Sequence, residues 1–165
     1  MISKKTKYAL KALIYLAHEY DRGPILIGDL AREEGPILIG DLAREEQIPK
    51  KFLELILLTL KNNGILQSKK GKGGGYYLGK EPKAIVMGKV IRILEGPLAP
   101  VPCVSETAYA KCEECTDEKT CGVRLLMKGV RDAIARIYDG TTLADIMEQI
   151  DNAEQEINGI MNFSI

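Results

Sequence analysis

IPKKFLELILLTLKNNGI, residues 48–65, carries the signals for the start, body and end of one helix. Pro49 fits the first turn of a helix, where its missing N–H costs nothing. Apolar side chains then recur every three or four residues, which is the period of a helix with one buried face. They are Phe52, Leu53, Ile56, Leu57 and Leu60. Asn63-Gly64 ends the pattern, since glycine accepts the left-handed conformation of a helix C-cap. The stretch predicts a helix over Lys50–Asn62.

A basic hairpin is predicted directly after this helix. Ile65–Ser68 and Tyr76–Leu78 are typical of short strands, and the glycine- and lysine-rich residues 69–75 join them. Two further helices are expected before the Lys50–Asn62 helix, over Thr6–Tyr20 and Asp41–Glu46. Three helices followed by a two-stranded hairpin is the order of a winged helix-turn-helix. The predicted fold class is therefore mainly α with a small two-stranded β wing, followed by a long dimerisation helix.

The polar side of the Lys50–Asn62 helix predicts contacts with DNA. Lys50 and Lys51 can reach phosphates or guanine edges, and Glu54 can accept a hydrogen bond from cytosine N4. The wing adds Lys69, Lys70 and Lys72 among glycines that permit a close approach to the duplex. A solvated lysine-rich hairpin is the alternative for the wing taken alone. Near matches to a phosphate-binding loop and a dinucleotide fingerprint in residues 71–80 lack key positions, which excludes both.

The charge distribution agrees with a DNA-binding head. The 165 residues hold 23 Lys+Arg and 23 Asp+Glu, so the net charge is zero. Residues 1–83 carry 15 and 10 of these (15 − 10 = +5), and residues 84–165 carry 8 and 13 (8 − 13 = −5). A basic first half suits binding to a polyanion. No apolar run reaches the roughly 18 residues that span a bilayer, and the N-terminus lacks a signal peptide, so we expect a cytoplasmic protein with no membrane partner.

Residues 23–46 contain an identical tandem repeat. Gly23–Glu34 and Gly35–Glu46 both read GPILIGDLAREE. A repeat architecture would show diverged and longer units, and at least three of them. The pair therefore indicates a recent duplication, an engineered insertion or an error in the sequence. We assign the second copy to the DNA-binding motif and the first to an inserted loop.

The second half is expected to hold three helices and an irregular segment. The helices are Ile85–Leu94, Val123–Tyr138 and Leu143–Ile150, the last with a capping box from Thr142 and Asp145. Apolar residues of Val123–Tyr138 lie near 3.5-residue spacing, which suits packing on a partner helix. The domain division is a DNA-binding domain (1–83), a linking helix with a cysteine-bearing loop (84–122), a dimerisation helix with a short capping helix (123–150), and a tail (151–165) without a clear signal.

All four cysteines fall within one short segment. Cys103, Cys112, Cys115 and Cys121 are separated by eight, two and five residues. In a reducing compartment such a cluster is more often a metal site than a disulfide framework. Four thiolates suit either tetrahedral zinc or an iron–sulfur cluster, and the residues alone leave both open.

These motifs together resemble the IscR/NsrR/CymR-type winged-helix regulators. The resemblance is carried by Tyr8-Ala9-Leu10, Ile48-Pro49-x-x-Phe52-Leu53-Glu54, Asn63-Gly64-Ile65, Gly71-x-Gly73-Gly74-Gly75-Tyr76-x-Leu78 and Thr142-Leu143-Ala144-Asp145. It covers nearly the whole chain except the extra twelve residues and the tail. It implies a homodimer that binds a palindromic promoter site. By position, Lys51, Glu54 and Lys70 match places where family members contact DNA.

The resemblance also favours an iron–sulfur cluster. It implies that Cys103, Cys115 and Cys121 hold a cluster, with 2Fe–2S favoured over 4Fe–4S. The chain departs from its relatives at the fourth ligand. Arg124 stands where some have histidine, and Lys7 stands where others have an acidic residue. Cys112 is the candidate fourth ligand, with a spare reactive thiol as its alternative, and His18 is expected to be a solvated or packing residue.

The function predicted from the sequence is a non-enzymatic, homodimeric regulator of transcription, a repressor whose DNA binding responds to the cluster. The residues show no Ser/His/Asp set and no phosphate loop. The alternatives are a metal-free or nitric-oxide- or redox-responsive regulator of the same fold, and a small iron–sulfur electron carrier.

Overall fold

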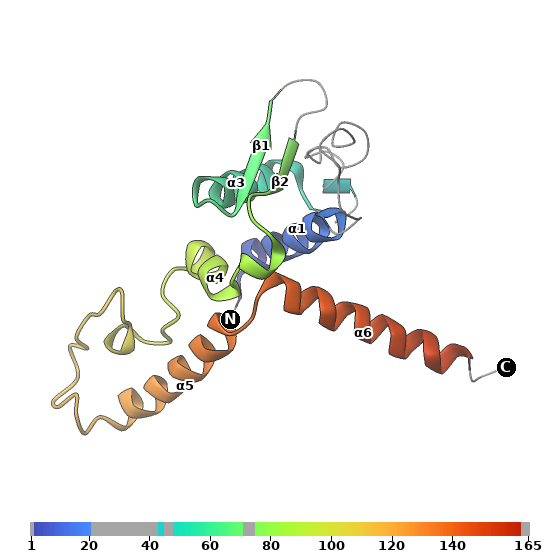
Figure 1. Ribbon diagram of the computed structural model, residues 1–165. Helices are drawn as coiled ribbons and strands as arrows, with labels where there is room; N and C mark the ends of the chain where they lie inside the picture. The colour runs from blue at the N-terminus through green and yellow to red at the C-terminus, as the bar shows by residue number, and fades with distance from the viewer. Residues whose placement is uncertain (1, 21–42, 45–47, 71–74, 163–165) are drawn as a thin grey trace.

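The computed structural model describes residues 2–20, 43–44, 48–70 and 75–162. In these ranges the chain forms α1 (Lys4–Tyr20), α3 (Lys50–Asn62), β1 (Leu66–Lys69), β2 (Gly75–Leu78), the 3-10 turn η1 (Pro82–Ala84), α4 (Met87–Glu95), the 3-10 turn η2 (Pro102–Val104), α5 (Gly122–Asp139) and α6 (Leu143–Asn162). Figure 1 shows a head built from α1, α3, α4 and the hairpin, from which α5 and α6 extend in different directions. The fold is a winged helix, as the sequence predicts, and α5 and α6 extend from it as two helical arms.

The core of the head is the apolar face of α1 packed against that of α3. Ala9, Leu13 and Ala17 of α1 are fully buried, and so are Leu53, Ile56, Leu57 and Leu60 of α3. The rings of Tyr8 and Phe52 meet edge to face, with centroids 5.7 Å apart. The observed limits of α3 match the prediction. Gly64 has a φ of 71°, in the left-handed region that favours glycine, and Ile65 donates its N–H to the carbonyl of Leu60.

The wing is an antiparallel hairpin with one buried side. Leu66 pairs with Leu78, and both are buried, while the next pair, Gln67 and Tyr77, faces solvent. The Tyr77 hydroxyl donates to Gln67 Oε1 at 2.9 Å. The first strand begins at Leu66 and not at Ile65 as predicted, because the backbone of Ile65 closes the end of α3 and accepts a hydrogen bond from Gly79.

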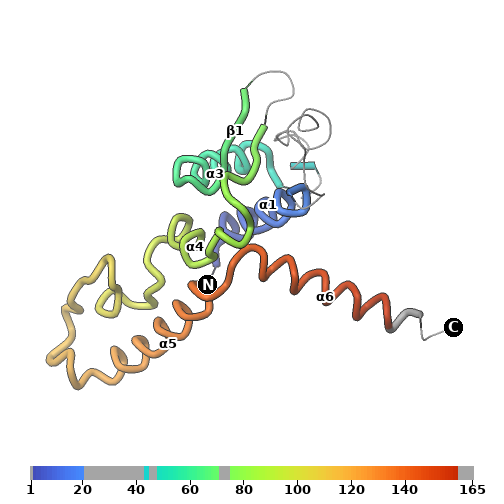
Figure 2. Tube along the Cα trace, in the orientation of Figure 1, coloured from blue at the N-terminus to red at the C-terminus, as the bar shows by residue number. Residues whose placement is uncertain are grey.

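The start of α4 is joined to the turn between α5 and α6. Val86 forms an antiparallel bridge with Thr142, Met87 donates its N–H to Thr141 O at 2.9 Å, and Leu143 donates to Ile85 O at 2.9 Å. The prediction that α4 begins at Ile85 is therefore wrong by two residues, since Ile85 and Val86 are extended to make this bridge. The trace in Figure 2 shows this crossing point at the base of the head.

The two arms differ in how they are covered. No residue of α5 is buried, whereas Leu143 and Met147 in the first turns of α6 lie in the core of the head. The helix α6 continues to Asn162, so the predicted end at Ile150 is wrong, and most of the predicted tail is helical. Nothing stops the helix after Ile150, because residues 151–158 contain neither proline nor glycine and keep apolar residues at Ala153 and Ile157.

The tandem repeat lies outside the described residues except for Ala43 and Arg44. Both of these are helical, at the place where the Asp41–Glu46 helix is expected. In the parts of the chain that the structure describes, no helix is long and apolar enough to cross a membrane.

Candidate nucleic-acid interface and cysteine segment

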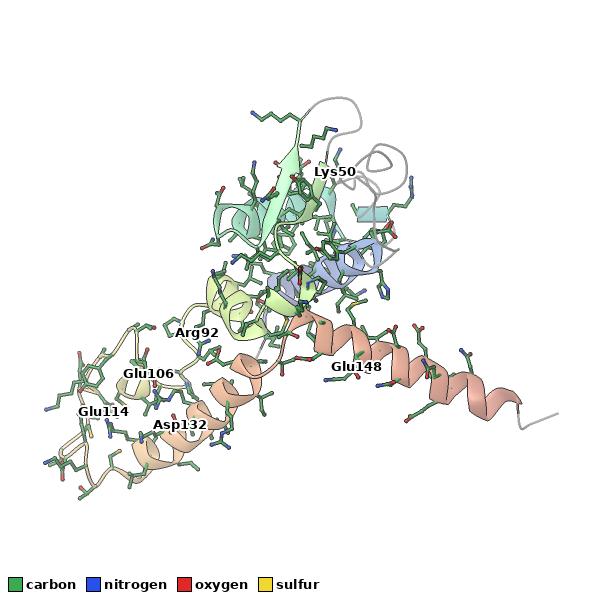
Figure 3. The ribbon with its side chains drawn as sticks, viewed as in Figure 1. Lys50, Arg92, Glu106, Glu114, Asp132 and Glu148 are labelled. Carbon is green, nitrogen blue, oxygen red and sulfur yellow. The ribbon has the colours of Figure 1, made fainter. Side chains whose placement is uncertain are left out.

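The first turns of α3 present a polar surface over a buried apolar one. Lys50, Lys51 and Glu54 are exposed, whereas Phe52 is half-buried and Leu53 is fully buried. This is the arrangement that a recognition helix requires, since one face holds the core and the other is free to enter a groove. Lys50 lies on the side of the head that carries the wing (Figure 3).

The wing extends this surface with two described lysines. Lys69 ends β1 opposite Gly75, Lys70 follows it, and both are exposed. Lys72, the third lysine expected to contact DNA, lies outside the described residues. The exposed ring of Tyr77 and its hydrogen bond to Gln67 add polar groups on the open face of the hairpin.

The cysteine segment runs from η2 to the start of α5. Cys103 lies within η2, Cys112 and Cys115 are joined by a turn in which Cys115 donates its N–H to Cys112 O, and Cys121 is the N-cap residue of α5. Cys112 is exposed and the other three are half-buried. All four thiols are free.

Cys115 and Cys121 are the two thiols that the structure brings together. The pKa of Cys121 is lowered, because the N–H of Arg124 in the first turn of α5 hydrogen bonds to its sulfur and Cys115 adds a side-chain hydrogen bond. Desolvation and the hydrogen bond to Cys121 raise the pKa of Cys115. Of the two thiols, Cys121 therefore has the lower pKa, and it accepts the hydrogen bond from Cys115.

Four thiols are suitable ligands for an iron–sulfur cluster, but they are not arranged around one point in this structure. Among the described residues, no three Cys, His, Asp or Glu side chains lie close enough to hold a metal ion. Cys103 and Cys112 would have to move toward the Cys115–Cys121 pair for three or four ligands to meet. The donor set is complete in number and type, but the segment is open.

Side chains other than the cysteines hold the segment in this open form. Asp117 accepts hydrogen bonds from the N–H of Lys119 and the hydroxyl of Thr120, both at 2.9 Å, and the Tyr109 hydroxyl donates to Glu118. Arg124 Nε donates to the carbonyl of Cys103 at 3.3 Å. Arg124 therefore joins η2 to α5. His18 is exposed on α1.

The arm α5 carries an uncovered apolar stripe. Val123, Leu126, Val130 and Ile137 are 61%, 63%, 38% and 66% exposed. Their spacing places them on one side of the helix, and the elements that the structure describes leave that side open. Exposed apolar stripes of this kind mark protein–protein contacts.

Comparison with known proteins places this architecture in a family. The family model described as "Rrf2: Iron-dependent Transcriptional regulator" matches residues 2–149. The chain belongs to the Rrf2 family. The match begins before α1 and ends in the first turns of α6, and it includes the cysteine segment, so the chain is an Rrf2-family transcriptional regulator.

Individual members of the Rrf2 family align over nearly the full chain. A putative HTH-type transcriptional regulator, rrf2-like, of Rhodobacter capsulatus is 38% identical over 150 residues, covering 89% of this chain and 92% of the relative. The structure of CymR, described as the global cysteine regulator of B. subtilis, is 33% identical with a TM-score of 0.67, covering 90% of this chain and 97% of that one. The structure of T. potens IscR has a TM-score of 0.68 at 24% identity, covering 93% and 90%, and shows the fold alone.

Two features of the interface were not anticipated from the sequence. Leu55 and Leu58 of α3 are 63% and 45% exposed, although their letters continue the apolar run of the helix. Counting helical turns from Leu53 and Leu57 would have placed both on the polar side, beside Glu54. An exposed leucine there is suited to contact with a thymine methyl group.

Proposed function

We propose that this Rrf2 regulator is a homodimer that binds palindromic promoter DNA and represses transcription. Lys50, Lys51 and Glu54 enter the major groove, and Lys69, Lys70 and Lys72 contact phosphates. The observation that carries the proposal is the exposed Lys50–Lys51–Glu54 surface on a helix whose other face is locked into the core. The adjoining basic wing supports it, since phosphate contacts supply most of the affinity for DNA.

The stripe on α5 supports the homodimer. Four large apolar side chains at helical spacing are uncovered in one protomer, and antiparallel packing of α5 on the α5 of a second copy would bury them. A two-fold dimer presents two recognition helices to two half-sites, which is how a palindrome is read. The regulator has no catalytic role in this proposal, and it acts where the chromosome lies, in the cytoplasm.

The proposed sensor is the segment from Cys103 to Cys121, with an iron–sulfur cluster as its ligand. Cys103, Cys115 and Cys121 would hold the cluster, Cys112 is the candidate fourth ligand, and 2Fe–2S is favoured over 4Fe–4S. The number and type of donors support this, as does the description of the family as iron-dependent. When bound, a cluster supplies a crosslink whose presence depends on iron supply and oxidants. The protein's part is to bring Cys103 and Cys112 toward the Cys115–Cys121 pair.

A thiol-based response is the second candidate for the same segment. The hydrogen bond between Cys115 and Cys121 favours it, because two neighbouring thiols, one with a lowered pKa, can lose two electrons and two protons to an oxidant such as hydrogen peroxide and form a disulfide. The similarity to CymR, described as a cysteine regulator, points the same way. Both candidates keep the DNA-binding head and differ only in what the cysteines respond to.

Absorbance of protein purified without oxygen separates the two candidates. A cluster gives broad visible absorbance with matched iron and sulfide, which Cys115→Ser and Cys121→Ser abolish. Cys112→Ser tests the fourth ligand. Protein that stays colourless after reconstitution with iron and sulfide removes the cluster, and rapid loss of two thiols on mild oxidation then supports the disulfide.

Binding to promoter DNA tests the head independently of the sensor. Affinity and sequence preference are compared for the loaded and cluster-free forms at one salt concentration. We expect the two forms to differ in affinity, in sequence preference or in both. Equal affinity and equal preference would remove the regulatory role of the segment, and no sequence-specific binding by either form would remove the proposed function itself.

A further inference from the structure

The outer surface of α3 carries two exposed leucines among its charged residues. It is formed by Lys50, Lys51, Glu54, Leu55 and Leu58. The two leucines are 63% and 45% exposed, on a helix whose opposite side is fully buried. Single exposed leucines are common on folded proteins, so exposure alone does not mark a site. The place of these leucines on the helix and the groups around them decide what they can contact.

Leu55 lies on the same line of the helix surface as Lys51. The two residues are four positions apart, so their side chains are neighbours one helical turn from each other. Leu55 is the sixth residue of α3 and directly follows Glu54. A recognition helix that enters the major groove by its N-terminus contacts bases from its first two turns, and Leu55 lies within them. A helix placed so that Lys51 and Glu54 reach the bases therefore brings Leu55 into the groove as well.

The charges around Leu55 fit a nucleic acid better than a protein surface. Lys50 and Lys51 precede it on α3, and the exposed Lys69 and Lys70 lie at the end of β1, which packs against α3 (Figure 1). The centre of a protein–protein contact is poor in charged residues, and the stripe of α5 has that character whereas this surface does not. The partner of this surface is therefore a polyanion that also offers an apolar group.

Apolar contact is the only means by which Leu55 can discriminate bases, since its side chain has no polar atom. Further along the same helix, the Thr59 hydroxyl donates to the Leu55 carbonyl and Asn63 Nδ2 donates to the Thr59 carbonyl, both at 2.8 Å. These two donors are used inside the helix and not on base edges. The apolar group that a base pair presents in the major groove is the 5-methyl group of thymine.

We propose that Leu55 reads the methyl group of a thymine in each half-site of the promoter. The inference rests on the proposed function and adds a specificity-determining residue to it. Glu54 accepts a hydrogen bond from cytosine and Leu55 covers a methyl group of thymine, so two neighbouring residues recognise the two pyrimidines. Burial of one methyl group favours thymine over uracil by roughly fourfold in one half-site, and by about fifteenfold when both half-sites are changed.

Replacement of thymine by uracil isolates this contact, because the two bases differ only in the 5-methyl group. The full-length wild type first selects its site from random DNA, and each thymine is then replaced by uracil at the matching positions of both half-sites. We expect one such pair of replacements to weaken binding by about fifteenfold at fixed salt, and the others to have little effect. A selected site without a fixed thymine in each half-site, or equal binding of every uracil-containing site, overturns the proposal.

Two matched variants assign the methyl contact to Leu55. Leu55→Ala should bind the thymine and uracil sites equally, and its Tm should stay near that of the wild type because the side chain is exposed. Leu58→Ala removes the same kind of side chain from the next turn and should keep the fifteenfold difference. A preference for thymine that persists in Leu55→Ala would mean that the shape or stiffness of the DNA is read, which contradicts the assignment. Loss of the preference in Leu58→Ala contradicts it as well.

Failure of this inference and failure of the proposed function give different results. Specific binding to the selected site without a preference for thymine over uracil would leave the regulator and remove the methyl contact. A selection in which the wild type enriches no site would remove the proposed function, and the methyl contact with it.

Discussion

Arg92 and Asp139 form a two-bonded ion pair that joins α4 to the last residue of α5. The Nη1–Oδ1 distance is 2.5 Å and the Nη2–Oδ2 distance is 2.9 Å. The hydrogen bonds raise the pKa of Arg92 and lower that of Asp139. Gly88 lies beneath the pair, because a Cβ at that position would stand 1.8 Å from Asp139 Oδ1. A side chain at residue 88 and the ion pair are therefore mutually exclusive as the helices now lie.

The effect of Gly88→Ala on the free energy of unfolding is expected to have opposite signs in the wild type and in an Asp139→Ala background. In the wild type it should lower the free energy of unfolding by about 1 kcal/mol, because it displaces the partly exposed ion pair. In an Asp139→Ala background the remaining close atom is Arg92 Nη1, at 2.7 Å, which is the end of a flexible side chain that has lost its partner and can move away. The same change should then stabilise by about 0.5 kcal/mol, since alanine favours a helix over glycine. Urea unfolding of the four proteins measures both values. Destabilisation of equal size in both backgrounds would contradict the steric account.

Replacing single lysines on the head should reduce the salt dependence of DNA binding. Lys51→Ala and Lys70→Ala each remove one expected contact from each protomer of the proposed dimer, so the slope of log affinity against log salt should fall by about 2 for each variant. Lys89→Ala, an exposed lysine of α4, is the control and should leave the slope unchanged. An equal loss for all three would indicate general electrostatic attraction and no defined interface.

Glu54→Ala should affect sequence preference more than affinity. A glutamate that accepts from cytosine N4 discriminates against other bases by about 1–3 kcal/mol at one position of each half-site. Its loss removes that discrimination, while total affinity holds or rises because a negative charge leaves the phosphates. Selection of binding sites from a random DNA library, done in parallel for wild type and variant, measures the preference. Identical selected sites would argue that Glu54 does not read a base.

An acidic residue in the stripe of α5 should separate the dimer. Leu126 is 63% exposed, and Leu126→Asp would bury a charge if this surface packs on a second copy. Sedimentation at micromolar concentration should show monomer. Leu125→Asp introduces the same charge at a neighbouring residue, which is 56% exposed and points about 100° away around the helix, so the dimer should persist. Equal dissociation by both variants would remove the stripe as the interface.

Glu95 should contribute to stability only above acidic pH. The Ser3 hydroxyl, the Thr6 hydroxyl and the Ser3 N–H donate to its carboxylate, and these bonds lower its pKa to about 2. Because the pKa of Glu95 is lower in the folded protein than its value of 4.5 in the unfolded chain, the ionised carboxylate stabilises the fold above pH 4.5. This contribution is lost as the pH falls from 4.5 toward 2. Glu95→Gln should therefore lower the Tm at pH 7, with the difference from wild type shrinking below about pH 4.5.

A matched control separates this effect from a change in net charge. Glu148→Gln removes one charge from an exposed position of α6 and should leave the pH dependence of the Tm unaltered. A constant difference between Glu95→Gln and wild type from pH 7 to pH 3 would mean that the hydrogen bonds do not depend on ionisation.

Local signals in the sequence predicted the elements whose ends are set by their own residues. The limits of α3 follow from Pro49 and Gly64. The capping box at the start of α6 is present, with the Thr142 N–H donating to Asp145 Oδ2 at 2.7 Å and the Asp145 N–H donating to Thr142 Oγ1 at 3.2 Å. In both places the contacts that fix the helix end join residues a few positions apart, so the local sequence is sufficient to predict it.

The remaining features depend on contacts that no local pattern encodes. Val86 is extended because it pairs with Thr142, more than fifty residues later in the chain. The spacing of the cysteines suggested one joint site, but Asp117, Tyr109 and Arg124 shape the segment so that only Cys115 and Cys121 meet. The ion pair between Arg131 and Glu106, at 2.7 Å, joins α5 to the segment after η2, and neither stretch of sequence alone predicts it.

The bridge between Val86 and Thr142, with the hydrogen bonds beside it, makes the base of α5 a fulcrum. The helix has 18 residues, so at 1.5 Å per residue it is a lever about 27 Å long, with Cys121 at its free end and the recognition head attached at the pivot. A shift of about 1 Å at Cys121 then equals a tilt of only about 2° at the head. A small displacement of the cysteines therefore changes the orientation of the DNA-binding head very little. A closure of several ångströms, such as the gathering of distant thiols, is what would turn the two recognition helices enough to matter.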